Sequence, residues 1–522
     1  MAQQVFGLID EVQDYLKQNR IVFDLQKQAD VDLLRAEAEH FTQAMREAKG
    51  RETDRPRMYC SGLIDDPGAA RNLTGFPDLL ALVVSVGGTY THMRAVQIQR
   101  GQVIPRSDLL VSRQGQDVPK ERVPTPCSDY QEHPVKQMVD EIAKYLVPWY
   151  VALLKESQPI TLVINWGFPQ QAVRLTDGSG LTGAIGQSMT KAQSGVQAQG
   201  QPLHEVFCRS LQQALKKQGL DLPEGFQVVV QNDTISSVYR YLLKSTRERY
   251  REIALMIMGT GTNLTSAEPY LTQTDGSFVL NEEGLPQRLD RFSQDGKEGR
   301  ENVWVNYEIG RLLPQFTLDQ CDCLRTEDEG KIELDIESFG LAGIGYLACF
   351  LNLIEDTFDD PKQIRLALEE SCACFSIGRV DLGAEWITSL AGRHALQDQE
   401  NILDSLSRAG LGHSQIQSLV ALAGAVISRS AQRAGIILAA MSLFNGFGLD
   451  FASAKPDALA LEGSLWKIKG FREEVFEVWQ SILKSEIKKA GSQALNAVFL
   501  FEDDYNAGVL GPAYMLGQFL NS

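Results

Sequence analysis

The chain has 522 residues, of which 43% are hydrophobic and 22% are charged, a composition typical of a globular protein with roughly two to four domains. Its formal net charge of −17 repels phosphate backbones, so we expect no nucleic-acid partner, although a local pocket of backbone N–H groups can still bind a nucleotide. Because no run of about 18 apolar residues occurs, we expect no membrane span.

The first 50 residues are predicted to be helical, with a break near 18–20. A signal peptide would carry basic residues and an apolar core here, whereas this segment carries acids, so we expect a cytoplasmic protein. A connector rich in glycine, proline and arginine follows over 51–78. One face of the first predicted helix is formed by Val5, Leu8, Ile9, Val12 and Leu16.

From residue 79 onward, predicted strands alternate with predicted helices, which favours an α/β architecture. Residues 110–132 and the glycine-rich stretch 172–202 are predicted loops. The predicted strands cover 79–86, 91–104, 160–169, 226–233 and 253–263. The predicted helices cover 133–157, 203–219, a segment from Thr234, most of 300–400 and the small-residue stretch 419–443.

The cysteines and histidines predict no metal site. Cys321 and Cys323, like Cys372 and Cys374, are too close in sequence for a C-x₂-C zinc hairpin. The six histidines form no HExxH motif. Reduced thiols are consistent with a cytoplasmic location.

Two glycine turns follow apolar strands, at 87–89 (Gly-Gly-Thr) and at 259–262 (Gly-Thr-Gly-Thr). Glycine lets the backbone approach a ligand closely, and adjacent N–H and hydroxyl groups suit phosphate oxygens. Asn263 follows the second turn and can both donate to and accept from a polyol. Either turn taken alone is equally compatible with a simple hairpin.

Asn232 and Asp233 stand at the carboxyl end of a predicted buried strand, the place where open α/β sheets bind ligands. An aspartate there can accept a proton from a substrate hydroxyl. The alternative is that Asp233 merely caps the helix that begins at Thr234.

The order of the motifs is more informative than any one of them. The chain carries, in sequence, Gly-Gly-Thr, Phe-Pro, Thr-Lys, Asn-Asp-Thr, Gly-Thr-Gly-Thr-Asn, Asn-x-Glu, a Gly-Ser turn and a final glycine-bearing helix start. This order and spacing resemble the hexokinase family, from about residue 41 to the C-terminus. The resemblance implies a two-lobed actin-like ATPase (ribonuclease H-like) fold, with a cleft between a small and a large lobe.

The resemblance also implies an organisation of the chain. The N-terminal helices and connector (1–76) pack on the large lobe, the small lobe spans 77–231, and the large lobe spans 232–506. The last helix (507–522) returns to the small lobe.

The resemblance assigns roles to individual residues. Asp233 is implied as the general base. The implied sugar ligands are Thr190, Lys191, Asn232, Asn263, Glu283 and Glu308, the last by a looser match. The implied phosphate loops are Gly87, Gly88 and Thr89, and Gly259, Thr260, Gly261 and Thr262. The turn that borders adenosine is implied to be Gly463 and Ser464.

Several positions depart from the family pattern. Ser85 replaces an aspartate that helps to position Mg²⁺, which weakens the expected metal site. Gly167 replaces the serine of Ser-Phe-Pro and removes a sugar contact. Smaller departures occur at Tyr90, at Met189, at Gly284-Leu285-Pro286 and at Gly511-Pro512-Ala513.

These observations favour an ATP-dependent kinase that phosphorylates the 6-hydroxyl of glucose or a related hexose, with ATP and Mg²⁺ as cofactors. One alternative is a degenerate, hexokinase-like sugar sensor with little phosphotransfer, which Ser85 favours. Another is a kinase of the same superfold that acts on a non-hexose hydroxyl. The sequence leaves open whether the protein is a monomer or a homodimer.

Overall fold

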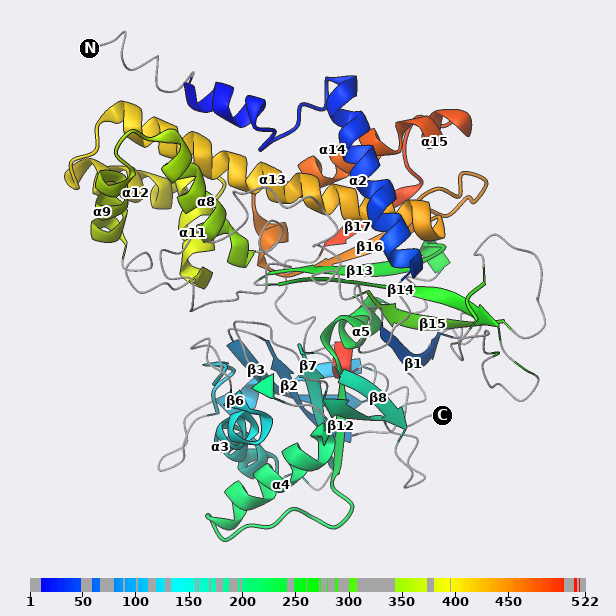
Figure 1. The fold of residues 1–522 in the computed structure, drawn as a ribbon. Coiled ribbons are helices and arrows are strands. Elements are labelled where there is room, and N and C mark those ends of the chain that lie inside the picture. Colours follow the sequence, from blue (N-terminus) through cyan, green and yellow to red (C-terminus); the bar gives the residue numbers. More distant parts are fainter. Residues whose placement is uncertain are drawn as a thin grey trace.

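The computed structural model describes residues 11–47, 59–65, 79–87, 90–99, 102–110, 119–126, 133–154, 156, 159–168, 170–174, 182–186, 196–197, 200–241, 248–259, 261–271, 273, 279, 287–289, 300–307, 343–372, 380–394, 396–501, 511–513 and 516. Two sheets, one in each of two lobes, organise these residues (Figure 1). In this part of the chain, no helix combines the length and apolarity needed to cross a membrane.

The small-lobe sheet has the strand order β12-β7-β2-β3-β4, with β5 paired to β3. The strands β2, β7 and β12 are parallel, whereas β3 and β4 continue from β2 as an antiparallel meander. Their bounds are β2 (Leu79–Val86), β3 (Tyr90–Gln99), β4 (Gln102–Pro105), β5 (Arg122–Pro124), β7 (Ile160–Trp166) and β12 (Gln227–Asn232).

The large-lobe sheet repeats this plan in the order β1-β15-β14-β13-β16-β17. Here β13, β14 and β15 form the antiparallel meander, and β16 and β17 are parallel to β13. The bounds are β1 (Tyr59–Asp65), β13 (Ile253–Met258), β14 (Thr262–Leu271), β15 (Arg300–Asn306), β16 (Asp457–Glu462) and β17 (Ala497–Phe501). A meander followed by two parallel strands in both lobes confirms the predicted α/β, actin-like fold.

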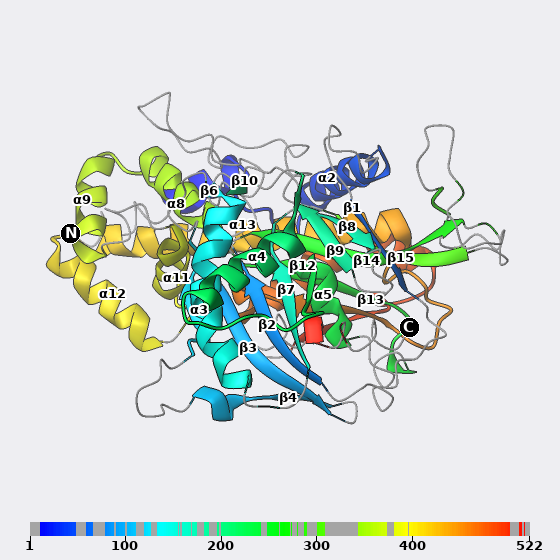
Figure 2. The same cartoon turned by 90° about the horizontal axis from the view of Figure 1, so that it is seen from below.

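Helices pack on the outer side of each lobe (Figure 1). In the small lobe, α3 (Val135–Leu153) and α4 (Leu203–Lys216) pack on the face that points away from the large lobe (Figure 2). The large lobe is covered by α2 (Gln28–Glu47), α8 (Gly343–Thr357), α9 (Pro361–Ser371), α11 (Val380–Leu390), α12 (Leu396–Arg408), α13 (His413–Asn445), α14 (Phe471–Ile482) and α15 (Lys484–Lys489). Of these, α8, α9, α11 and α12 form a group beside the N-terminal half of α13 (Figure 1).

A further apolar core lies between the two sheets, where the inner face of each is turned toward the other lobe. It joins Ala81 and Val83 of β2 to Leu255 of β13 and Ala460 of β16. Helix α5 (Asp233–Val238) lies between the sheets and contributes Ile235 to this core (Figure 1). The 3₁₀ turn η3 (Tyr239–Tyr241) continues α5. The lobes therefore share buried surface around the helix that carries Asp233.

The structure confirms most of the predicted elements and adds strands that we did not predict. The strands expected over 79–86 and 226–233 and the helix over 419–443 are present as β2, β12 and α13. Strand β1 lies in the predicted connector 51–78, and β15 lies in the region 300–400 that we predicted to be mostly helical. The predicted loop 172–202 contains part of β8 (Gln170–Arg174) and all of β9 (Thr182–Gly186). These strands are short, charged or glycine-bearing, so pairing with neighbours rather than their own pattern defines them. The remaining short elements are β6 (His133–Pro134), β10 (Val196–Gln197), β11 (Gln201–Pro202), η2 (Ser107–Leu110) and η7 (Ser464–Lys467).

The N-terminal helix α2 is fixed to the large lobe by a bidentate ion pair. Arg35 of α2 donates to Glu486 of α15 through Nη2 at 2.7 Å and through Nη1 at 2.8 Å. Burial alone raises the pKa of Glu486, but hydrogen bonds from Arg35 and Ser485 outweigh it and lower that pKa to about 2. Since the folded state favours the ionised carboxylate, the pair stabilises the fold at neutral pH.

We expect Glu486→Gln to lower the free energy of unfolding by about 1–2 kcal/mol at pH 7, because a partly exposed pair contributes less than its full pKa shift. The folded pKa lies below the unfolded one, so the difference from wild type should shrink as pH falls from about 4.5 toward about 2. Denaturant unfolding across this pH range measures it. Glu39→Gln is the matched control, because Glu39 pairs with the same arginine but is largely exposed. An equal loss in both variants would contradict the assignment.

Candidate active site

The structure brings together part of the predicted site. Seven of the predicted residues lie outside the described part of the chain: Gly88, Thr89, Thr190, Lys191, Thr260, Glu283 and Glu308. The others lie at the ends of strands in the two sheets: Gly87, Asn232, Asp233, Gly259, Gly261, Thr262, Asn263, Gly463 and Ser464.

Asn232 and Asp233 form the junction between β12 and α5. Asn232 is the N-cap of α5, and its Oδ1 accepts a hydrogen bond from the backbone N–H of Thr234 at 3.0 Å. Asp233 Oδ1 accepts from the same N–H at 2.8 Å. Capping and the predicted ligand roles are therefore compatible, because the cap uses Oδ1 of each side chain and not Nδ2 of Asn232 or Oδ2 of Asp233.

The carboxylate of Asp233 lies close to two glycines of the small lobe. A Cβ built on Gly167 would lie 3.3 Å from Asp233 Oδ2, 3.5 Å from the Cα of Gly87 and 2.7 Å from the carbonyl oxygen of Val86. The N–H of Gly167 donates to that same carbonyl at 2.9 Å, which draws the two backbones together. Position 167 therefore has no room for the serine of the family pattern unless the backbone moves.

Gly87 begins the first turn, which is a hairpin between β2 and β3. Its N–H donates to the carbonyl of Tyr90 at 3.1 Å, and its carbonyl accepts from Thr125 Oγ1 at 2.7 Å. The guanidinium of Arg122 covers the ring of Tyr90 at 3.5 Å. Tyr90, one of the departures from the family pattern, thus takes part in packing the hairpin.

Four polar side chains form a row across the small-lobe sheet, close to the edge at which its parallel strands end. The register places His92, Ser85, Asn165 and Gln231 side by side on β3, β2, β7 and β12. Burial and the nearby Arg122 and Arg94 lower the pKa of His92, so this imidazole is neutral at pH 7. The row therefore carries no charge at the place where the family pattern has a carboxylate.

Within this row, Ser85 belongs to a chain of hydrogen bonds that reaches α5. Asn165 Nδ2 donates to Ser85 Oγ at 3.1 Å, and Asn165 Oδ1 accepts from Ser236 Oγ at 2.5 Å. The shorter distance suits an O–H···O bond, which fixes the orientation of the amide. Asn165 and Ser236 were not predicted as site residues. Asn165 stands out as a buried amide in a largely apolar strand, whereas Ser236 lies in a short helix that is mostly polar and gives no such signal.

The second turn connects β13 to β14 in the large lobe. No heavy atom of the described residues lies within 4 Å of a Cβ built on Gly259 or Gly261, so contacts within the protein do not require glycine there. Thr262 Oγ1 is buried and has no hydrogen-bond partner among the described residues. The N–H of Gly259 donates to the carbonyl of Gly261 at 2.9 Å, so it already has an acceptor within the turn. The open space beside the two glycines and the unpaired hydroxyl of Thr262 fit the phosphate groups of a nucleotide.

Gly463 follows β16 and lies against the end of β13. Its φ of +104° is in the region that favours glycine, and a built Cβ would lie 2.1 Å from the carbonyl oxygen of Met258. The exposed Ser464 comes next. The predicted adenosine turn and the second phosphate turn are thus neighbours in space. The preceding residue, Glu462, accepts a hydrogen bond from Tyr241 of η3 at 2.5 Å, a link to the α5 connection that we did not predict.

The described residues fit a nucleotide better than they fit a protein-bound metal ion. Among them, no group of three or more histidine, cysteine, aspartate or glutamate side chains could hold a metal. On the small-lobe side, the carboxylate of Asp233 lies near Gly167 and the first glycine turn. Position 85, where the family pattern has a second carboxylate, holds a neutral serine.

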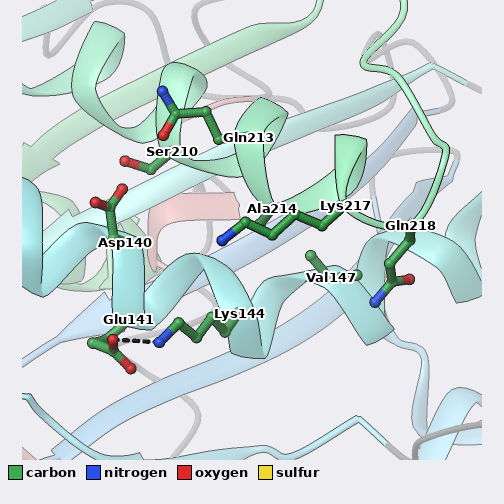
Figure 3. A pocket seen from close by; sticks show the side chains of 9 residues that line it. All are labelled: Asp140, Glu141, Lys144, Val147, Ser210, Gln213, Ala214, Lys217 and Gln218. Carbon is green, nitrogen blue, oxygen red and sulfur yellow. Dashed lines mark hydrogen bonds and ion pairs between the residues drawn. The ribbon is translucent and has the colours of Figure 1, made fainter.

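A separate hollow of about 440 Å³ lies between α3 and α4 on the outer face of the small lobe (Figure 3). Its charged groups largely pair locally, since Lys144 binds Glu141 and Lys136 binds Asp140. Helix α5 packs on the other face of this sheet, so the hollow is not part of the site around Asp233.

Comparisons with known proteins agree with this architecture. No family model and no curated protein sequence matches the chain. Among solved structures, the chain is similar to a hexokinase from Schistosoma mansoni complexed with glucose, with a TM-score of 0.62 and 17% sequence identity over 99% of this chain and 100% of that one. It is also similar to another crystal structure of a hexokinase, with a TM-score of 0.55 and 14% identity over 98% and 99% of the two chains. The chain therefore has the two-lobed hexokinase fold over its full length.

Proposed function

We propose that the protein is a hexokinase-family enzyme that transfers the γ-phosphoryl group of ATP to the 6-hydroxyl of glucose or a related hexose. The observation that carries this proposal is the position of the Asp233 carboxylate, which lies beside the first glycine turn at the end of β12. The shared fold supports the class of reaction.

In the proposed reaction, no covalent bond forms between the protein and the phosphoryl group. Asp233 accepts the proton of the 6-hydroxyl, the hydroxyl oxygen forms a bond to the γ-phosphorus, and the bond between that phosphorus and the ADP oxygen breaks. In this proposal, Mg²⁺ binds together with the nucleotide as Mg-ATP. The protein contributes alignment of the alcohol and phosphate, and exclusion of water by lobe closure.

Two asparagines are suited to hold the sugar. In both, the amide oxygen is engaged: Asn232 Oδ1 accepts from Thr234, and Asn263 Oδ1 accepts from the N–H of Leu264 at 2.9 Å. Their NH₂ groups therefore remain as donors to sugar oxygens. In the proposal, Thr190 and Lys191 add further contacts.

Of the two glutamates proposed as sugar ligands, the strand register supports Glu308. The N–H of Tyr307 donates to the carbonyl of Leu264 at 2.9 Å, so the residue that precedes Glu308 is paired beside Asn263. Val279 and Gln287 lie four positions before and after Glu283 in the sequence. Both form backbone hydrogen bonds with Leu271, which is at the other end of β14 from Asn263.

The nucleotide is proposed to bind across both glycine turns. The N–H groups and hydroxyls of Thr89, Thr260 and Thr262 would bind phosphate oxygens. Gly463 and Ser464 would border the adenosine, a placement supported by the contact of Gly463 with Met258. We also propose a cytoplasmic location.

A sugar sensor with little phosphotransfer is the second candidate, and the neutral row around Ser85 favours it. A hydroxyl that already accepts from Asn165 does not replace a carboxylate in positioning Mg²⁺. Release of ADP from Mg-ATP with glucose, mannose, fructose, glucosamine and a non-sugar alcohol separates the candidates. Calorimetric binding of sugar without sugar-stimulated turnover would reject the kinase and support the sensor.

Asp233→Asn should lower sugar-stimulated turnover by about 100- to 10,000-fold, the usual contribution of a general base. The amide oxygen can still accept from the N–H of Thr234, so the cap of α5 and the binding of ATP should persist. Steady-state ADP release measures turnover, and calorimetry with ATP is the control for folding. Near wild-type turnover in this variant would show that another group takes the proton.

Glu308→Gln should weaken glucose binding by about 10- to 100-fold, because a hydrogen bond to a charged group contributes about 1.5–3 kcal/mol. Glu283→Gln should also weaken binding, because Glu283 is the other proposed sugar ligand. Glu39→Gln, on an exposed glutamate of α2, is the control and should bind glucose like wild type. Calorimetry with glucose measures all three variants, and wild-type binding in Glu308→Gln would remove Glu308 from the proposed sugar site.

Ser85→Asp should lower the free Mg²⁺ concentration needed for half-maximal turnover, because the new carboxylate can accept from Asn165 and face a metal-bound water. Ser85→Asn has a similar shape without the charge and should leave the Mg²⁺ requirement unchanged. If both variants behave like wild type, position 85 does not limit the use of the metal.

A further inference from the structure

A second polar cavity, of about 500 Å³, opens in the large lobe where the C-terminal ends of α2 and α13 meet the far end of β14. Its lining includes Arg46, Glu268, Arg288, Phe444 and Asn445. Glu268 follows Thr262 by six residues of β14, a separation of roughly 20 Å along an extended strand. The cavity is therefore distinct from the proposed nucleotide site, and its volume suits a small metabolite.

The floor of this cavity is a fully buried carboxylate. Glu268 is 0% exposed, and its Oε1 accepts a hydrogen bond from the buried hydroxyl of Tyr307. That hydroxyl also contacts Ser266 Oγ at 2.6 Å, and Asn445 Nδ2 donates to the same Ser266 Oγ at 3.3 Å. A buried charge requires a partner, and here the partner is Arg288, whose Nε lies 3.0 Å from Glu268 Oε2.

Arg288 makes two contacts in the cavity. The ion pair with Glu268 engages its Nε edge, and the plane of the guanidinium lies over the ring of Phe444 at 3.5 Å. Among the described residues, no acceptor bonds its terminal Nη groups. These contacts orient the guanidinium, and its unbonded Nη donors suit bidentate binding of a carboxylate or phosphate.

A second arginine lies at the rim of the same cavity. Arg46 is in the last turn of α2, is exposed, and has no ion pair among the described residues. The charged residues named in the lining are Arg46, Arg288 and Glu268, and their charges sum to +1. The whole chain, in contrast, has a net charge of −17. A locally positive cavity on an acidic protein favours an anionic occupant.

We propose that this cavity is a binding site for a small oxyanion, a phosphorylated or carboxylated metabolite whose anionic group lies between Arg288 and Arg46. Phe444 and Asn445 would contact the remainder of the ligand. The site is separate from the proposed catalytic residues, and its occupancy does not depend on whether the protein is a kinase.

Calorimetry on the full chain with inorganic phosphate, and in a second arm with malonate, tests the proposal. The variants are Arg46→Gln, which changes an exposed side chain, and Arg288→Lys, which keeps a cation beside Glu268 but loses the planar fork. Each should weaken binding of the preferred oxyanion by at least about tenfold. Arg209→Gln, on an exposed arginine of α4, is the matched control and should bind like wild type.

The two arms identify the ligand class, since tighter binding of phosphate or of malonate indicates a phosphorylated or a carboxylated metabolite. Thr262→Ala removes a proposed nucleotide contact and should leave binding at this cavity unchanged. The proposal is overturned if wild type binds neither anion, or if binding is unaffected by both Arg46→Gln and Arg288→Lys. Loss of phosphate binding in Thr262→Ala alone would place the anion at the glycine turns instead.

Discussion

The site depends on backbone segments that approach each other too closely to admit a side chain. Gly167 meets the carbonyl of Val86 at the end of β2, and Gly463 meets the carbonyl of Met258 at the end of β13. Each contact joins the glycine turn of a meander to the next parallel strand of the same sheet. The two lobes therefore build their turns by the same constraint, and the constraint brings the turns to the edge where the parallel strands end.

The same kind of contact joins the last segment of the chain to the helix that carries the proposed base. A Cβ on Gly511 would lie 2.3 Å from the carbonyl oxygen of Ser236 in α5. Ser236 in turn hydrogen-bonds to Asn165, which holds Ser85. The position of Asp233 is thus coupled to the C-terminal segment on one side and to the polar row of the small-lobe sheet on the other.

Much of the fold could be predicted from the sequence because its central strands are continuous apolar runs. Leu79–Val86 is buried on both faces, so its identity as a strand needs no partner to be recognised. The edge strand Tyr59–Asp65 lacks such a run and is defined by its pairing with β15, so we assigned it to the connector. The site residues likewise fall into those that the sequence could predict and those that it could not. Glycine turns and Asn-Asp-Thr are local signals, whereas the bonds of Asn165, Ser236, Tyr241 and Glu462 join residues tens to hundreds of positions apart, which no local pattern shows.

The loss of the carboxylate at position 85 has two opposing electrostatic consequences for a triphosphate ligand. Two like charges 4 Å apart repel by about 4 kcal/mol at an effective dielectric constant of 20, so a bare aspartate beside the phosphates would be unfavourable without an intervening cation. Ser85 removes that repulsion, which on a chain with a charge of −17 would favour binding of the proposed nucleotide by N–H and hydroxyl donors. It also removes the group that would fix Mg²⁺ between protein and phosphate. In the proposed kinase, one residue would therefore affect nucleotide binding and phosphotransfer in opposite directions, and the placement of Mg²⁺ would limit the use of Asp233 as a base more than the affinity for the nucleotide would.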